Sequence, residues 1–187
     1  MNVKYREIEE KDAYGFEFVA AHSWKDTYWN LLPQERLIKR IERLSKKEEL
    51  EKKIKDTKEY IKSNPKKIYV AELNNQIVGI LAIDTNEECG YLEAIYVLPE
   101  YKGKGIGKEL LFLAIKKFIE LGYNKFTLEC MRGNITIDFY KKYGGSIIDT
   151  SKQIIYDKEV EVDTVLFENI KEILLEETNN NIKKQKE

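Results

Sequence analysis

The segment best suited to chemistry is a run of glycines and lysines that separates a strand-like stretch from a helix-like one. Glycines let the backbone wrap closely around an anion and point several N–H groups at it. The helix N-terminus that follows adds partial positive charge, and three lysines add formal charge. The sequence therefore predicts a phosphate or pyrophosphate site here. Its residues are Lys102, Gly103, Lys104, Gly105, Ile106, Gly107 and Lys108.

Two common phosphate loops fit this segment poorly. A P-loop requires Ser or Thr after its Gly-Lys pair, whereas Glu109 follows Gly107-Lys108, and Lys102 stands where the first glycine belongs. A dinucleotide loop requires a third glycine where Lys108 stands. Glu129 lies at a suitable spacing for a ribose contact, but that interpretation leaves the first hundred residues unexplained. Both are set aside.

Two motifs together favour another family. The stretch at residues 91–111 resembles motif A of the GNAT acetyltransferases, whose loop reads Gln/Arg-x-x-Gly-x-Gly/Ala. Lys102 replaces the Gln or Arg, a small departure if the loop binds pyrophosphate mainly through its backbone. Residues 134–145 resemble motif B, in which Asn begins a short helix and Phe-Tyr precedes a glycine. Two motifs in the right order are more specific than either alone, and the resemblance covers residues 3–167.

The resemblance implies an α/β fold, with one mixed and mostly antiparallel sheet of about seven strands flanked by helices and splayed between its fourth and fifth strands. Residues 1–170 would form this domain, and residues 171–187 a helical or disordered tail. The apolar pattern agrees with these elements. It predicts helices at 11–25, 34–62 (divided near Ser45 by a capping-box pattern), 105–121 and 135–143, and strands at 3–8, 67–73, 76–84, 89–97, 125–131, 146–155 and 160–167.

Acetyl-CoA is the cosubstrate that the resemblance implies. It would lie in the cleft between the splayed strands, where the backbone of Ile95, Tyr96 and Val97 contacts the pantetheine arm and the thioester. A backbone N–H there, that of Val97, would stabilise the oxyanion of the tetrahedral intermediate. Asn134 would also bind the cofactor, and its residue type is independently suited to an N-cap.

Two residues are candidates for proton transfer. Tyr140 matches the position that protonates the departing CoA thiolate in many family members; the alternative is a packing tyrosine, one of 12 in the chain. Period-two alternation places Glu93 on the strand face of Ile95 and Val97, toward the cleft. Glu93 is then a general base, an anchor for a cationic amine or an ion-pair partner, and the sequence does not choose.

The acceptor side is expected to be aromatic. Trp24, Tyr28 and Trp29 could bind a cation through their ring faces, or could be buried against the sheet. Residues 22–33 resemble the corresponding part of bacterial members that include polyamine acetyltransferases, which favours a small primary amine such as a polyamine. The alternatives are a protein N-terminus or lysine, and a module that binds acyl-CoA without turnover. His22 is interpreted as structural.

Composition limits the partners. The 187 residues include 32 basic and 33 acidic side chains, so there is no basic excess for nucleic-acid binding. The N-terminus lacks a signal-peptide core, and the longest apolar run, 110–115, is too short to cross a bilayer, so no membrane partner and a cytoplasmic location are expected. Two cysteines and one histidine give no metal-ligand cluster. A homodimer is compatible with the sequence.

Overall fold

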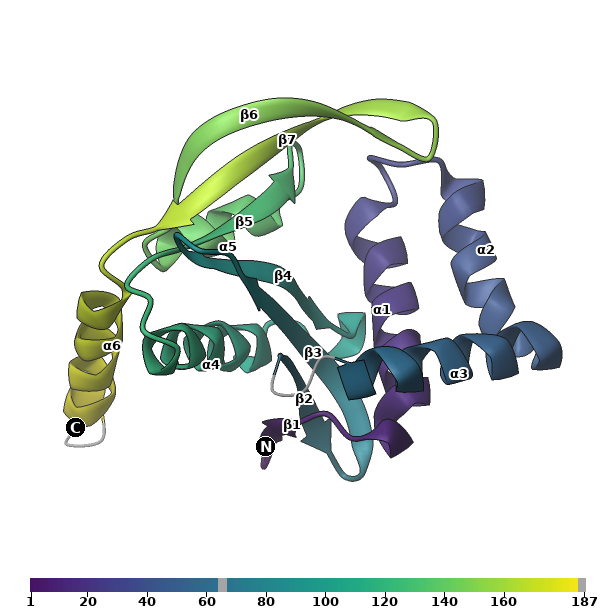
Figure 1. Cartoon of the computed structure of the whole chain (residues 1–187), viewed down its shortest axis with the longest axis horizontal. Helices are drawn as coiled ribbons and strands as arrows, with labels where there is room; N and C mark the ends of the chain where they lie inside the picture. Colours follow the sequence, from purple (N-terminus) through teal and green to yellow (C-terminus); the bar gives the residue numbers. More distant parts are fainter. Residues whose placement is uncertain (64–66, 185–187) are drawn as a thin grey trace.

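The computed structural model describes residues 1–63 and 67–184 and is built around one mixed sheet (Figure 1). Among these residues the sheet has seven strands in the order β1-β2-β3-β4-β5-β7-β6. Only the β4–β5 pair is parallel. The strands are β1 (Lys4–Glu7), β2 (Ile68–Leu73), β3 (Gln76–Thr85), β4 (Gly90–Val97), β5 (Phe126–Met131), β6 (Ser146–Ile155) and β7 (Lys158–Phe167).

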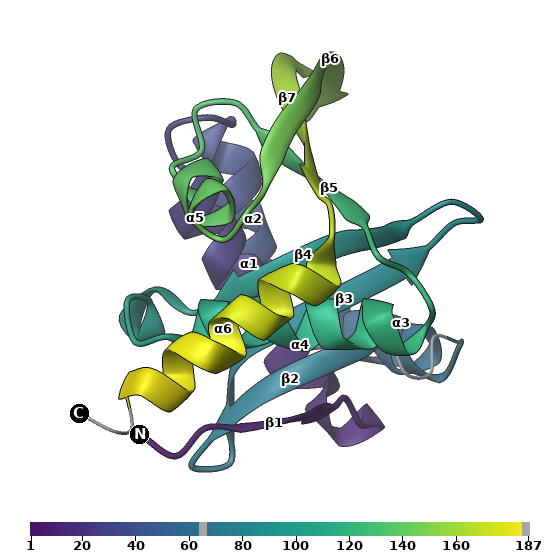
Figure 2. The same ribbon diagram turned by 90° about the vertical axis from the view of Figure 1, so that its left-hand side faces the viewer.

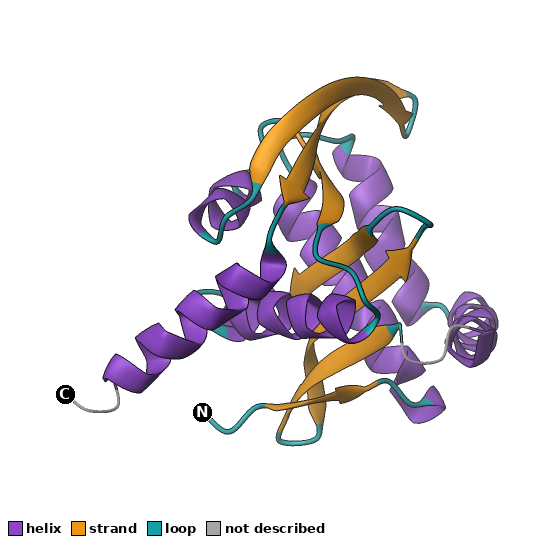
Figure 3. Cartoon of the chain, turned by 60° about the vertical axis from the view of Figure 1, so that its left-hand side comes forward, coloured by secondary structure: helices purple, strands orange, loops and turns teal. Residues whose placement is uncertain are grey.

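Helices cover both faces of the sheet. One face packs on α4, with α6 beside it, and the opposite face packs on α1, with α2 and α3 outside it (Figures 1 and 3). Short 3₁₀ turns, η1 (Glu10–Asp12) and η2 (Pro99–Tyr101), precede α1 and the glycine loop. The α-helices are α1 (Ala13–Tyr28), α2 (Gln34–Ser45), α3 (Lys47–Ser63), α4 (Ile106–Glu120), α5 (Thr136–Lys142) and α6 (Ile170–Lys184).

The predicted splay between the fourth and fifth strands is present. Strands β4 and β5 pair only at Gly90 with Phe126 and at Tyr91 with Thr127. Beyond these pairs β5 diverges from β4 and continues with β7 and β6 as a separate wing (Figure 2). Beyond Tyr91, the main-chain groups on that edge of β4 therefore have no pairing partner on β5.

The apolar face predicted for the long helix is confirmed in α4. Leu110, Leu111, Ala114, Ile115 and Phe118 are all fully buried. They recur at helical spacing, so one stripe of α4 meets the sheet while its lysines reach solvent. This packing fixes the position of the first turn of α4, where the glycine loop ends.

The break between α2 and α3 was predicted correctly, but its mechanism was not. Lys46 has an extended backbone that ends α2. The expected capping box of Ser45 with Glu48 is not the observed contact, because the Ser45 hydroxyl donates backward to the Glu42 carbonyl at 2.7 Å. The Ser45 side chain thus bonds within the helix that it ends.

The C-terminal segment is helical, one of the two forms expected for it. Helix α6 continues to Lys184, and residues 185–187 lie outside the described part of the chain. Ile170 is fully buried, and Ile173 packs against Gly144. The apolar residues at the start of α6 therefore dock it onto the domain, while the division at residue 170 stays a prediction.

Candidate active site

The main chain of β4 presents polar groups to the splay. The N–H of Leu98 donates to the Val78 carbonyl of β3 at 2.9 Å. Because antiparallel strands direct alternate residues to the same neighbour, Tyr96 also faces β3, whereas Ile95 and Val97 direct their N–H and C=O groups the other way. That is the side from which β5 has separated, so Ile95 and Val97 have the orientation predicted for the pantetheine and the thioester, whereas the Tyr96 main chain is directed to β3 and does not.

The glycine loop has the backbone conformation that the sequence suggests. Gly103 and Gly105 have φ angles of 74° and 87°, in the left-handed region that favours glycine. Gly105 is the N-cap of α4 and supplies no side-chain cap. The first N–H groups of α4 therefore have no capping side chain and are available to an anion.

The three lysines of the loop are not equivalent. Lys102 forms an ion pair with Asp26 of α1 at 2.6 Å. Lys108 forms an ion pair with Glu177 of α6, and this hydrogen bond raises the pKa of Lys108. Lys104 is exposed. Carboxylates thus compensate two of the three predicted charges, which leaves the backbone N–H groups as the main attraction for a phosphate.

Tyr140, on α5, is buried with 7% of its surface exposed. Its hydroxyl has no hydrogen-bond partner among the described residues. Burial raises the pKa of Tyr140 far above its ordinary value, and the nearby Cys130 and Tyr96 add to the effect. The phenol therefore keeps its proton at neutral pH.

Asn134 lies one residue before Ile135, the N-cap of α5. Its Oδ1 accepts hydrogen bonds from the N–H of Thr136 at 2.9 Å and from the Thr136 hydroxyl at 2.7 Å. Asn134 thus bonds to the first residue of the helix, as its residue type favours, but it is not the N-cap itself. Its Nδ2 has no acceptor within the described part of the chain, so the amide can still donate to a ligand.

The predicted side-chain direction of Glu93 is wrong. The register shifts between Ala82 and Ile83 of β3, which pair with Ala94 and Leu92, so Glu93 is the extra residue of a β-bulge. Alternation breaks there, and Leu92 joins Ile95 in the core on the α4 face. Glu93 is exposed and accepts a long hydrogen bond of 3.4 Å from the Tyr60 hydroxyl of α3.

The aromatic residues of α1 do reach the splay. The Trp24 Nε1 donates to the Tyr96 hydroxyl at 2.8 Å, and the rings of Trp24 and Tyr28 lie 4.8 Å apart. Burial raises the pKa of Tyr28, and Tyr96 and Cys130 contribute. Side chains of β4 and β5 thus meet α1 at the open end of the splay.

Two of the predicted cation-binding faces already carry cations of the chain. The Arg40 guanidinium lies 4.5 Å from the centroid of the Trp24 ring. The Lys25 ammonium lies 5.4 Å from that of Trp29. A substrate ammonium would have to displace these groups to use the same faces.

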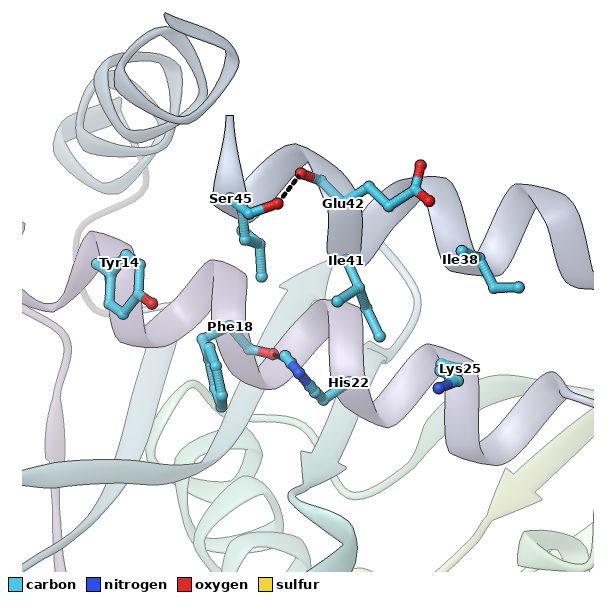
Figure 4. Close-up of a pocket in the computed structure, with 9 residues that line it drawn as sticks. Tyr14, Phe18, His22, Lys25, Ile38, Ile41, Glu42 and Ser45 are labelled. Atoms are coloured by element: carbon cyan, nitrogen blue, oxygen red, sulfur yellow. Dashed lines mark hydrogen bonds between the residues drawn. The ribbon is translucent and has the colours of Figure 1, made fainter. Parts of the chain in front are cut away.

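His22 lies between helices. Its Nδ1 is 2.9 Å from the Phe18 carbonyl, its ring stacks on Phe18 at 4.0 Å, and it lines a pocket formed by α1 and α2 (Figure 4). Cys130 is buried, and burial raises the pKa of its thiol to about 11. A protonated thiol is a weak nucleophile, so Cys130 is unsuited to carry the acyl group.

Three residues near the site were not predicted from the sequence. Ser23 donates from its hydroxyl to the Val97 carbonyl at 3.1 Å. Tyr60 contacts Glu93, and Arg40 contacts Trp24. Their signals in the sequence were weak. Ser23 is a serine on the apolar face of a predicted helix, and nothing in the sequence distinguishes Arg40 from the neighbouring charged residues.

Comparison with known proteins agrees with this geometry. Residues 23–145 match the family model of the acetyltransferase (GNAT) family. A spermidine N(1)-acetyltransferase of Thermoplasma acidophilum is 28% identical over 86% of this chain and 99% of its own. An N-acetyltransferase of Archaeoglobus fulgidus and a ribosomal protein bS18-alanine N-acetyltransferase of Haemophilus influenzae are each 35% identical, but the chain spans only 41% and 54% of their lengths.

Solved structures share the fold. The PaiA N-acetyltransferase of Thermoplasma acidophilum, in complex with coenzyme A, gives a TM-score of 0.68 at 22% identity, with 90% of this chain and 99% of the other covered. A GCN5-related N-acetyltransferase of Rhodopseudomonas palustris gives 0.70 at 14% identity, over 90% and 96%. The chain belongs to the GNAT acetyltransferase family, and it is an acyltransferase.

Two other kinds of feature are absent from the described residues. Within residues 1–63 and 67–184, no helix is long and apolar enough to span a membrane. The same residues contain no group of three or more His, Cys, Asp or Glu side chains placed to hold a metal ion.

Proposed function

We propose that this protein transfers the acetyl group of acetyl-CoA directly to the primary amine of a small molecule. The observation that carries the proposal is the position of Tyr140. Its side chain is buried, its hydroxyl has no hydrogen-bond partner among the described residues, and it lies close to Cys130 of β5 and Tyr96 of β4. A phenol without a partner in the protein is available to donate its proton to a ligand. The spermidine acetyltransferase relative supports a small amine as the acceptor.

Each step has a residue assigned to it. The glycine loop, from Lys102 to Lys108, and Asn134 bind the pyrophosphate and pantetheine of acetyl-CoA. The neutral amine forms a bond to the thioester carbon, and the Val97 N–H donates to the resulting oxyanion. The intermediate then collapses, the C–S bond breaks, and the CoA sulfur takes the Tyr140 proton. The ammonium proton leaves to water, which can pass it to the exposed Glu93, and Tyr140 regains a proton from solvent.

A thiol-release assay with acetyl-CoA and separate amines tests this function. Spermidine, putrescine, cadaverine, lysine, ornithine and an alanine-terminated peptide form the panel. We expect release that depends on at least one small amine and yields one N-acetylated product per thiol. Transfer confined to the peptide would contradict the small-molecule acceptor. Release with none of them, although acetyl-CoA binds in calorimetry, would favour a binding module.

A further inference from the structure

A charged pocket of about 460 Å³ lies between α1, α2, α3 and the β6–β7 turn. Its lining contains four cationic and three anionic side chains, so it carries one net positive charge. The charged side chains include Glu17, Arg40, Arg43, Glu49, Lys53 and Asp56.

Two of the carboxylates in the charged pocket already have partners within the chain. Arg43 forms a 3.7 Å ion pair with Glu49. Glu17 is buried, with 7% of its surface exposed, forms a 3.5 Å ion pair with Lys53 and accepts a 2.5 Å hydrogen bond from the Thr57 hydroxyl. The Glu17 and Glu49 carboxylates are therefore not free to anchor a polyamine, whereas the third carboxylate, Asp56, is exposed and has no ion pair among the described residues.

Arg40 is different from these neighbours. Among the described residues no carboxylate lies within 4.0 Å of its guanidinium, which makes one long 3.4 Å hydrogen bond to the Tyr156 hydroxyl. Its face is held against the Trp24 ring, with 4.5 Å between the guanidinium carbon and the ring centroid. A guanidinium stacked in this way keeps its N–H edge free, and that edge matches a carboxylate in a bidentate geometry.

The position of Arg40 connects the charged pocket to the reaction centre. The Nε1–H group of Trp24 donates to the Tyr96 hydroxyl at 2.8 Å. Tyr96 immediately precedes Val97 on β4. Burial raises the pKa of Tyr96, and the positive charge of Arg40 opposes that rise, as expected for close groups. An acceptor bound at Arg40 is thus one aromatic side chain away from the thioester end of the splay.

We infer that the acceptor is an amine that also carries a carboxylate, the chemical class of an amino acid, and that Arg40 binds this carboxylate. The inference rests on the proposed acetyl transfer. The Arg40 cation, already stacked on Trp24, repels a second cation there, whereas it attracts an anion. At this position Arg40 thus favours an amino acid over a plain diamine.

Substrate pairs that differ only in a carboxylate test the inference. Lysine is cadaverine with an α-carboxylate, and ornithine is putrescine with one. We expect kcat/KM to be at least tenfold higher for the amino acid of each pair. Arg40→Gln should raise KM for lysine at least tenfold and change cadaverine turnover less than threefold, and Arg40→Lys should recover part of the loss.

Arg36→Gln is the matched control, because Arg36 lies one turn earlier on α2 and pairs with the exposed Asp157 at 3.0 Å. It should leave both substrates unaffected. Equal or better turnover of the diamines would overturn the carboxylate site while leaving acetyl transfer intact. Equal losses for both members of a pair in Arg40→Gln, or a weaker affinity for acetyl-CoA, would assign Arg40 a structural or cofactor role instead. Turnover of no amine at all would reject both proposals.

Discussion

The hydroxyl of Ser23, on α1, donates a 3.1 Å hydrogen bond to the main-chain carbonyl of Val97, on β4. The two residues are 74 positions apart in the chain, and the Ser23 side chain is buried. The bond ties the end of β4 to α1 just where β5 no longer holds it. It thereby helps to position the Val97 N–H that faces the splay.

Ser23→Ala should lower both stability and turnover. Leaving the buried Val97 carbonyl without its donor costs about 1–3 kcal/mol of unfolding free energy. Looser positioning of the Val97 N–H should lower kcat about tenfold, because a small displacement of a group that contacts the reacting atoms raises the activation free energy. Urea unfolding and steady-state kinetics measure the two effects, with the exposed Ser63→Ala as control. An unchanged kcat in a destabilised variant would contradict the positioning role.

Gly105→Val should weaken acetyl-CoA binding. With φ at 87° the position strains any β-branched residue, and the loop would turn its N–H groups away from the pyrophosphate. Calorimetry should show about tenfold or greater loss of affinity, or 1.4 kcal/mol. Gly122→Val, at another positive-φ glycine far from the loop, controls for strain alone. Equal affinities in the two folded variants would remove the loop from the cofactor site.

Glu93→Gln separates a base from an anchor. The bulge leaves Glu93 exposed beside Tyr60, where it can receive a proton through water. If Glu93 accepts that proton, kcat should fall about tenfold or more, mainly below the pH at which the amine deprotonates by itself. Glu88→Gln, in the β3–β4 turn, is the control. A rise in KM for cationic amines with kcat preserved would make Glu93 an anchor.

Tyr140→Phe should lower kcat and kcat/KM together by roughly 10²-fold, as expected for losing a general acid. Acetyl-CoA affinity should stay within a factor of about three, because the ring still packs against Phe139 and Phe167. Because the pKa of Tyr140 is raised above its ordinary value, the wild-type phenol stays protonated as pH rises. Deprotonation of Tyr140 should therefore lower the wild-type kcat only above pH ~10.

Tyr143→Phe, on the same helix, is the matched control for Tyr140→Phe. It should retain wild-type kcat, because its ring keeps its packing on Phe112 and Phe139 when the hydroxyl is removed. A lowered melting temperature with kcat preserved in Tyr140→Phe would make Tyr140 a packing residue only.

The ion pair of Arg6 with Asp12 predicts acid sensitivity of the fold. Burial by itself raises the pKa of Asp12, but hydrogen bonds from Arg6, at 2.6 and 2.9 Å, and from the Glu9 N–H outweigh it, so the pKa lies below its ordinary value. A lowered folded-state pKa stabilises the fold above the unfolded value, about 3.9, and this stability is lost as pH falls.

Asp12→Asn should therefore cost about 1–3 kcal/mol at neutral pH, and the difference from wild type should shrink below pH ~4. Urea unfolding across pH measures it. Asp157→Asn, at an exposed ion pair, should cost less than about 1 kcal/mol at any pH. A difference that persists at low pH would show that Asp12 acts through packing and not through its charge.

The sequence by itself determined the local features of this protein. Glycine spacing predicted the loop at 103–107, because only glycine readily adopts the positive φ found at Gly103 and Gly105. Helical periodicity predicted the buried face of α4, and residue type predicted that the Asn134 side chain bonds to the start of α5. These properties depend on a few neighbouring residues, so they can be read along the chain.

Tertiary structure alone decided the rest. The bulge at Glu93 depends on the register of β4 against β3, which no local pattern encodes, and it reverses the direction of a side chain. The carboxylates that pair with Lys102 and Lys108 come from α1 and α6, distant in sequence. Arg40 differs from other surface arginines only because folding places it on Trp24 without a carboxylate. The energies of charged groups depend on such distances and on burial, and only the folded chain sets either.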